Sequence, residues 1–246
     1  MSKRSFAIIT TLFIITVLII GCSKDNHETL VPLGDEYYIR PIDDIYPKTY
    51  RDRWPNLAPG YYSMSGGNLQ PPINEGFLPP KIEGEYVIKG MRIAGDETMH
   101  TPNGEDIPFP YSTVNGMNIY FNVKGQKNGL ANIYIREYNK HGIEVKEVDS
   151  VFIYGNGATG EFSMCFDAIR PMGQLGEQTL GYIITGKMGY KSENDSTYGI
   201  RDVRMWHVVK EKTETLPQYI NIGGQRAYKD SIGFAEKVEY GWGFEK

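Results

Sequence analysis

An alternation of apolar and polar residues with a period of two, repeated from residue 82 onward, is the feature that most restricts the fold of this 246-residue chain. Successive side chains of a β-strand point to opposite faces, so this spacing indicates strands with one buried face. The runs that share the pattern are 82–93, 117–124, 130–138, 143–154, 160–166, 179–186 and 199–210, with weaker runs at 219–222, 226–231 and 237–242.

The segments between these runs indicate how the strands pair. They are rich in Gly, Asn and Asp, as at 127–129 (KNG) and 155–157 (GNG), which favours hairpin turns. None of them contains an amphipathic helix of about 10 to 15 residues, the usual crossover between parallel strands. We therefore predict an all-β domain with an antiparallel meander. Closure into a barrel would remove exposed edges, so we expect a barrel, with a β-sandwich as the alternative.

The segment before the predicted strands has a different composition. Residues 31–80 hold nine of the fourteen prolines and eight aromatic residues. Proline lacks the N–H group that a helix or central strand requires, which excludes either element over most of this length. A simple tether would not need so many aromatic side chains. We predict that residues 36–80 form a Pro/Tyr-rich extended arm lying against a β-domain of residues 81–246, with one helical turn at 51–57.

The N-terminus carries a targeting signal. Lys3 and Arg4 precede an apolar run at 6–20 that only threonines interrupt, shorter than the roughly 20 residues of a membrane-spanning helix. The run ends in residues 18–22 (LIIGC), which resemble the lipobox of bacterial lipoproteins. This resemblance implies that the signal peptide, residues 1–21, is removed and that the thiol of Cys22 is lipidated, with fatty chains such as palmitate holding the protein to a membrane.

The residues after the lipobox suggest where the anchor lies. Residues 22–35 are expected to be a lipidated tether, and 23–28 (SKDNHE) resemble the export tract of Bacteroidetes surface lipoproteins. The resemblance implies an outer-membrane lipoprotein exposed at the cell surface. The formal charge of −4 gives no general attraction to nucleic acid. With Cys22 modified, only Cys165 remains, and its apolar neighbours predict a buried thiol instead of a nucleophile.

A second resemblance concerns the β-domain. Residues 82–86 (IEGEY) are similar to the first strand of lipocalin-like or calycin-like barrels, and residues 181–187 (GYIITGK) with 198–203 (YGIRDV) are similar to the last hairpin of Bacteroidetes β-barrel lipoproteins. Tyr86 stands where lipocalins usually have tryptophan. The resemblance implies a closed barrel.

The motifs of the common enzyme classes are missing from the sequence. It has no nucleophile elbow, P-loop or dinucleotide fingerprint, and its four histidines do not have zinc-ligand spacing. We therefore expect no catalytic residue, no metal and no cofactor. Carboxylate pairs such as Glu83 and Glu85 leave a glycan-active hydrolase as a less favoured hypothesis.

Aromatic residues are the remaining candidates for ligand binding, because their rings offer apolar faces to sugars and to protein partners. Strand alternation predicts that His207 shares the inner face with Met205 and that Trp206 faces outward. Sealing of the arm against the barrel is the alternative role for most of the aromatic residues. The candidate ligand-binding residues are Trp54, Tyr61, Tyr62, Trp206 and His207.

These features favour a lipid-anchored, non-enzymatic binding protein of the outer membrane. Its ligand would be a glycan, a small apolar molecule or an envelope protein, because barrel mouths are common ligand sites. A fimbrillin-like structural or adhesive surface protein is the alternative, and it would require a sandwich with an exchangeable terminal strand.

Overall fold

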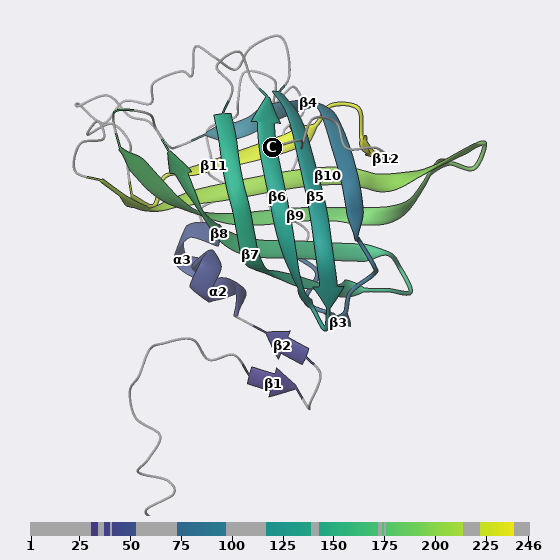
Figure 1. Ribbon diagram of the computed structural model, residues 1–246, viewed down its shortest axis with the longest axis horizontal. Helices are drawn as coiled ribbons and strands as arrows, with labels where there is room; N and C mark the ends of the chain where they lie inside the picture. Colours follow the sequence, from purple (N-terminus) through teal and green to yellow (C-terminus); the bar gives the residue numbers. More distant parts are fainter. Residues whose placement is uncertain are drawn as a thin grey trace, which may run out of the picture. The chain divides into compact units, whose positions relative to one another are not determined.

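The computed structural model describes residues 31–33, 37–39, 41–52, 73–96, 117–138, 143–171, 174, 176–213 and 222–238. A short antiparallel hairpin comes first, formed by β1 (Val31–Leu33) and β2 (Tyr37–Ile39). Two helices of one turn follow, α2 (Ile42–Ile45) and α3 (Lys48–Arg51). The rest of the described chain is almost entirely one β-sheet (Figure 1).

The sheet has ten strands, and the predicted all-β class is confirmed. Neighbouring strands pair antiparallel except β3, which pairs parallel with β7. The strands are β3 (Phe77–Leu78), β4 (Gly84–Asp96), β5 (Met117–Lys127), β6 (Leu130–Tyr138), β7 (Ile143–Asn156), β8 (Glu161–Pro171), β9 (Glu177–Ser192), β10 (Asp195–Lys212), β11 (Gln225–Asp230) and β12 (Phe234–Val238).

The sheet closes on itself. Strands β4 to β10 pair in sequence order, and β10 then pairs with both β11 and β12, which pair back to β4. Strand β11 uses residues 204–208 of β10 and β12 uses residues 199–201, so the two short strands share one position in the circuit. The result is a ring of eight strands. This closure distinguishes the fold from the alternative sandwich, whose two sheets keep open edges.

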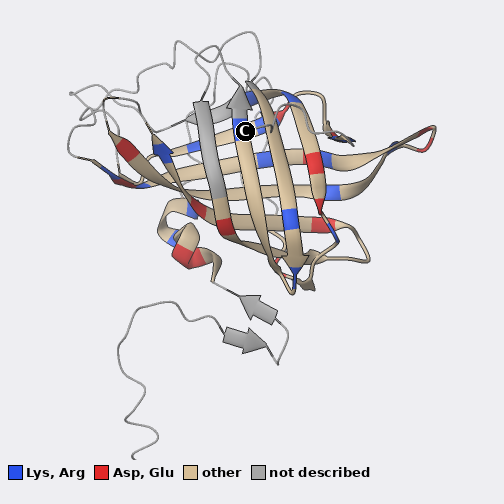
Figure 2. Cartoon of the chain, in the orientation of Figure 1, with Lys and Arg blue, Asp and Glu red and all other residues tan. Residues whose placement is uncertain are grey.

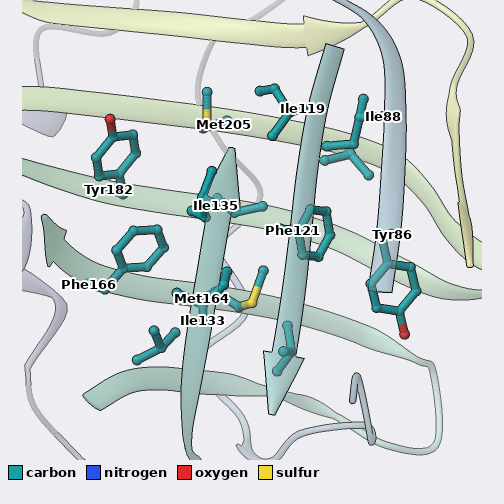
Figure 3. Packing of buried hydrophobic residues seen from close by; sticks show 14 of the residues in the cluster. Tyr86, Ile88, Ile119, Phe121, Ile133, Ile135, Met164, Phe166, Tyr182 and Met205 are labelled. Carbon is teal, nitrogen blue, oxygen red and sulfur yellow. The ribbon is translucent and has the colours of Figure 1, made fainter. Parts of the chain in front are cut away.

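Apolar side chains fill the interior of the ring (Figure 3). Every second residue of a strand points inward, as Phe162, Met164 and Phe166 do on β8. Tyr86 stacks on Phe121 with ring centroids 5.1 Å apart. Burial of such side chains contributes roughly 1.5 to 3 kcal/mol each, so this packing is the main source of stability.

One end of the ring is sealed by the segment that leads into β4. The backbone N–H of Ile82 donates to Oε1 of Gln126 at 2.7 Å, and Nε2 of Gln126 donates to the carbonyl of Pro80 at 2.8 Å. Ile82 itself is buried in the interior cluster. The β5–β6, β7–β8 and β9–β10 connections, all short, lie at this end, because each joins consecutive antiparallel strands.

The outer face of β7 to β11 is covered by the arm. Ile42, Ile45 and Tyr46 pack on a second apolar cluster. Its members on the sheet are Phe152, Tyr154, Cys165, Ile183, Trp206, Val208 and Ala227. The prediction that the arm lies against the β-domain is confirmed for residues 41–52.

Polar contacts hold this part of the arm in one register. The hydroxyl of Tyr46 donates to Oε1 of Gln225 at 2.7 Å, and Nε2 of Gln225 donates to the carbonyl of Tyr50 at 2.9 Å. Nζ of Lys210 donates to the carbonyl of Asp44 at 2.9 Å and also pairs with Asp167. Because buried polar groups need partners, these bonds make the docking specific as well as favourable.

Two local predictions differ from the structure. The helical turns precede residues 51–57, and each begins directly after a proline, Pro41 or Pro47, whose fixed φ suits a helix start. Residues 53–57 lie outside the described residues. The last strand, predicted at 237–242, is β12 at Phe234–Val238, while residues 239–242 also lie outside them. The position of β12 is set by its pairing with β4 and β10, because the alternation in its own sequence is too weak to define it.

Candidate functional site

The inner face of the ring becomes polar toward the end where β8 leads to β9 and β10 leads to β11. Four buried polar residues lie there, one from each of these strands: Arg170, Gln178, His207 and Arg226. Tyr182 and Tyr228 adjoin them on the same face. We call these six residues the polar cluster. It lies at the opposite end from the seal formed by Ile82 and Gln126.

Strand register brings the cluster together. His207 of β10 lies opposite Tyr182 of β9 on one side and opposite Arg226 of β11 on the other. Arg170 of β8 lies opposite Gln178 of β9. Adjacent strands are about 4.8 Å apart, so Tyr182 and Arg226 are direct neighbours of His207, while Arg170 and Gln178 are neighbours of each other further along the same end.

His207 lies between two aromatic rings. Its ring centroid is 5.5 Å from that of Tyr182, at an interplanar angle of 75°, and 5.5 Å from that of Tyr228, at 58°. Burial lowers the pKa of His207 well below 6.5, and the positive charges of Arg226 and Arg170 lower it further. The imidazole is therefore neutral at physiological pH. Its Nδ1 atom has no hydrogen-bond partner within the described part of the chain.

The arginines give the cluster its electrostatic character. Nη1 of Arg226 donates to the hydroxyl of Tyr228 at 3.5 Å. Arg170, Gln178 and both tyrosines also take part in further interactions. A guanidinium group offers a planar set of donors that matches a carboxylate or a phosphate. Two of them on a buried inner face suit this end of the ring to an acidic group.

The predicted candidate residues have different outcomes. His207 is on the inner face, as alternation predicted. Trp206 is on the outer face, as alternation predicted, and it is only 2% exposed because Ile42, Ile45 and Tyr46 of the arm cover it. Trp206 is therefore part of the seal between arm and ring. Cys22, Trp54, Tyr61 and Tyr62 lie outside the described residues.

Sequence reasoning missed Arg170, Gln178 and Arg226. Arg170 lies beyond the end of the strand predicted at 160–166, whereas β8 runs to Pro171. A usable signal existed in the alternation, since Arg170 follows Ala168 and Arg226 precedes Tyr228 at a spacing of two. Charged residues at such positions are usually assigned to the solvent face.

The side chains considered for nucleophilic or carboxylate chemistry are Cys165, Glu83 and Glu85. Cys165 is buried beneath the arm, and burial raises the pKa of its thiol, as expected of a packed residue. A hydrogen bond from Lys81 and another from the backbone of Gln126 lower the pKa of Glu83, so it is no proton donor at neutral pH. Glu85 accepts a hydrogen bond from Nδ2 of Asn122 at 3.0 Å.

The chain has no match among protein-family models, curated proteins or solved structures. Among the described residues, no three His, Cys, Asp or Glu side chains are grouped closely enough to hold a metal ion. None of the described helices is long and apolar enough to cross a membrane.

Proposed function

We propose that this protein is a lipid-anchored, non-enzymatic binding protein of the outer membrane that takes a small acidic ligand, such as an acidic sugar, at the polar cluster. The observation that carries the proposal is a pair of buried arginines on the inner face of the ring: Arg226 lies directly opposite His207, and the charge of Arg170 also acts on His207. Elsewhere the described interior is filled with apolar side chains, which supports a polar ligand at this end over a purely apolar one inside.

The chemistry of the cluster supports a ligand with both charge and hydroxyl groups. In a low-dielectric interior, a charge-assisted hydrogen bond from Arg170 or Arg226 is stronger than in water. The neutral imidazole of His207 can donate through one nitrogen and accept through the other. The rings of Tyr182 and Tyr228 add apolar faces on which a sugar can stack.

The anchoring part of the proposal rests on Cys22 and the apolar run before it. Replacement of Cys22 by serine removes the thiol that receives the lipid, so labelled palmitate should no longer be incorporated and the protein should leave the membrane fraction. Full recovery of the Cys22→Ser protein in membranes, or palmitate in that variant, would contradict lipid anchoring.

The alternative fimbrillin-like role is not favoured by a specific observation. It required an open sandwich with an exchangeable terminal strand. In the ring, β11 and β12 each pair with β4 on one side and with β10 on the other. Both strands are therefore bonded on two sides, and together they close the circuit between β4 and β10.

Ligand binding can be tested by calorimetry on the mature lipidated protein in micelles of a detergent without a sugar headgroup. Glucuronate is the probe, and glucose is the uncharged control of the same ring shape. We expect glucuronate to bind and Arg226→Gln to weaken binding at least about tenfold, since a charge-assisted hydrogen bond contributes about 1.5 to 3 kcal/mol. Arg204→Gln, a control on the same strand as His207 but outside the cluster, should bind normally.

Two results would contradict the acidic-ligand assignment: equal binding of glucose and glucuronate, or unchanged binding by Arg226→Gln. Circular dichroism establishes that each variant is folded. His207→Gln gives a second variant that keeps both arginines, and it should weaken binding without abolishing it.

A further inference from the structure

The β9–β10 hairpin extends beyond its neighbours at the sealed end of the ring (Figure 1). Strand β8 pairs with β9 only as far as Lys187, and β12 pairs with β10 only from Gly199 onward. Residues 189–198 therefore form a ribbon of two strands, and the described part of the chain places no third strand beside them. A two-stranded ribbon has little stability of its own, so the contacts within this one are needed to keep it ordered.

The tip of the ribbon is held by its own polar contacts. Nζ of Lys191 pairs with Oδ2 of Asp195 at 3.3 Å, and the backbone N–H of Thr197 donates to Oδ1 of Asp195 at 3.0 Å. Acidic residues mark the tip in Figure 2, but the pairing of Lys191 with Asp195 balances part of this charge. The ribbon is thus an ordered projection.

Two tyrosines occupy one face of this ribbon. Tyr190 and Tyr198 lie directly opposite each other, with ring centroids 5.4 Å apart and an interplanar angle of 76°. They are 60% and 41% exposed. The next pair on the same face, Met188 and Ile200, is buried in the interior of the ring. The tyrosines therefore continue the inner face of the ring out into solvent.

A third tyrosine lies at the base of this surface. Tyr86 is buried, and its hydroxyl has no hydrogen-bond partner in the described residues. Figure 3 shows this hydroxyl pointing away from Phe121 and the other core side chains. Only β12 separates Tyr86 from Tyr198: Lys237 lies opposite Tyr86, and Glu236 lies opposite Gly199, the neighbour of Tyr198. Burial raises the pKa of Tyr86, and Tyr198 raises it further. A buried hydroxyl without a partner costs about 1 to 3 kcal/mol and calls for a ligand or water.

We propose that Tyr190, Tyr198 and Tyr86 form a second binding site, which takes the ring of a neutral sugar. The exposed tyrosine rings offer faces on which the C–H groups of a sugar can stack. The hydroxyl of Tyr86 supplies a hydrogen-bond partner for a sugar hydroxyl. This site lies at the opposite end of the ring from the polar cluster and does not depend on it.

Size and charge favour a sugar over a protein partner. A stable protein interface buries about 800 Å² on each side, far more than two tyrosine side chains present. On the side toward the ring, the pair that flanks Tyr190 and Tyr198 on this face is Met188 and Ile200, and both are apolar. A neutral ligand with one apolar face and several hydroxyl groups fits these properties.

The test uses the mature lipidated protein in a detergent without a sugar headgroup, titrated with cellohexaose, maltohexaose, xylohexaose and mannohexaose. We expect at least one of these to bind, and Tyr190→Ala to weaken its binding roughly three- to tenfold, as expected for loss of one aromatic contact. Tyr86→Phe, which keeps the ring and removes only the hydroxyl, should weaken binding by a similar factor. Phe77→Ala removes an exposed aromatic ring elsewhere and should have no effect.

Absence of binding by all four oligosaccharides would overturn the proposal, and so would unchanged affinity in both Tyr190→Ala and Tyr86→Phe. Because Tyr190 is exposed, its replacement should leave the fold intact, which thermal unfolding can establish. Arg226→Gln should retain binding here, so a failure of the polar cluster and a failure of this site give different results.

Discussion

Gly181 of β9 lies directly beneath the backbone carbonyl oxygen of Ile45 in α2, so closely that a Cβ atom at position 181 would overlap this oxygen. The overlap would involve backbone atoms, which cannot move aside as a flexible side chain can. The absence of a side chain at this one position therefore allows the arm to pack on the outer face of the ring.

We predict that Gly181→Ala releases the arm from the ring. The measurement is the reaction rate of Cys165 with a thiol reagent in a Cys22→Ser background, where Cys165 is the only thiol. Since the arm covers Cys165, the rate should rise several-fold as the arm leaves. Gly157→Ala is the matched control, because a Cβ at this turn would make only ordinary contacts. A rate that Gly181→Ala leaves unchanged would show that the arm tolerates the overlap.

Tyr46→Phe should lower the free energy of unfolding by about 1 to 3 kcal/mol. The ring stays in the apolar cluster, but Oε1 of Gln225 loses the donor 2.7 Å away and remains buried. Urea denaturation followed by circular dichroism measures the change. Tyr190→Phe, which removes an exposed hydroxyl, should change the stability by much less. Similar losses in the two variants would mean that the hydrogen bond between Tyr46 and Gln225 has no special role.

Stability should fall as the pH is lowered below 6.5, partly because of His207. Its pKa is lowered in the folded state, so the unfolded chain takes up a proton near pH 6.5 that the folded chain does not. This loss is at most about 1.4 kcal/mol for each pH unit. In His207→Gln, the decline between pH 6.5 and 5 should be shallower, as measured by urea denaturation at several pH values. Parallel pH profiles would show that His207 is protonated in the folded protein.

Removal of residues 1–80 should leave a less stable protein than one that starts at residue 30. The shorter chain lacks Ile42, Ile45 and Tyr46, which cover Trp206, and it also lacks the carbonyl of Pro80 that accepts a hydrogen bond from Gln126. We expect a lower melting temperature and faster labelling of Cys165. Equal melting temperatures for the two chains would indicate that the arm is only a tether.

Much of the sheet could be predicted because each strand carries its own alternation. The run at 130–138 matches β6 (Leu130–Tyr138), and the run at 143–154 matches β7 (Ile143–Asn156) closely. The predicted runs at 179–186 and 199–210 are too short. Strand β9 continues as far as Ser192, and β10 already begins at Asp195. The ends of β9 and β10 at this hairpin are polar and resemble a loop in composition. These ends are nevertheless strands, because β9 and β10 pair with each other there.

The candidate site was predictable only in part. Alternation placed His207 on the inner face, but it could not show that Arg170 and Arg226 lie near it, since strand order and register bring them together. Trp206 shows that alternation also does not predict which outward-facing residues are buried. Its face was correct, and its burial depends on a helix more than 150 residues earlier in the chain.

The sequence by itself determined the all-β class, the antiparallel hairpins and the face of each strand that turns inward, because these follow from the period of two and from local turn chemistry. Only the tertiary structure decided that the sheet closes through β11 and β12, that the arm covers Trp206 and Cys165, and that the charges of two arginines act on His207. Those features depend on contacts between residues far apart in the chain, and such contacts leave no periodic trace in the order of the amino acids.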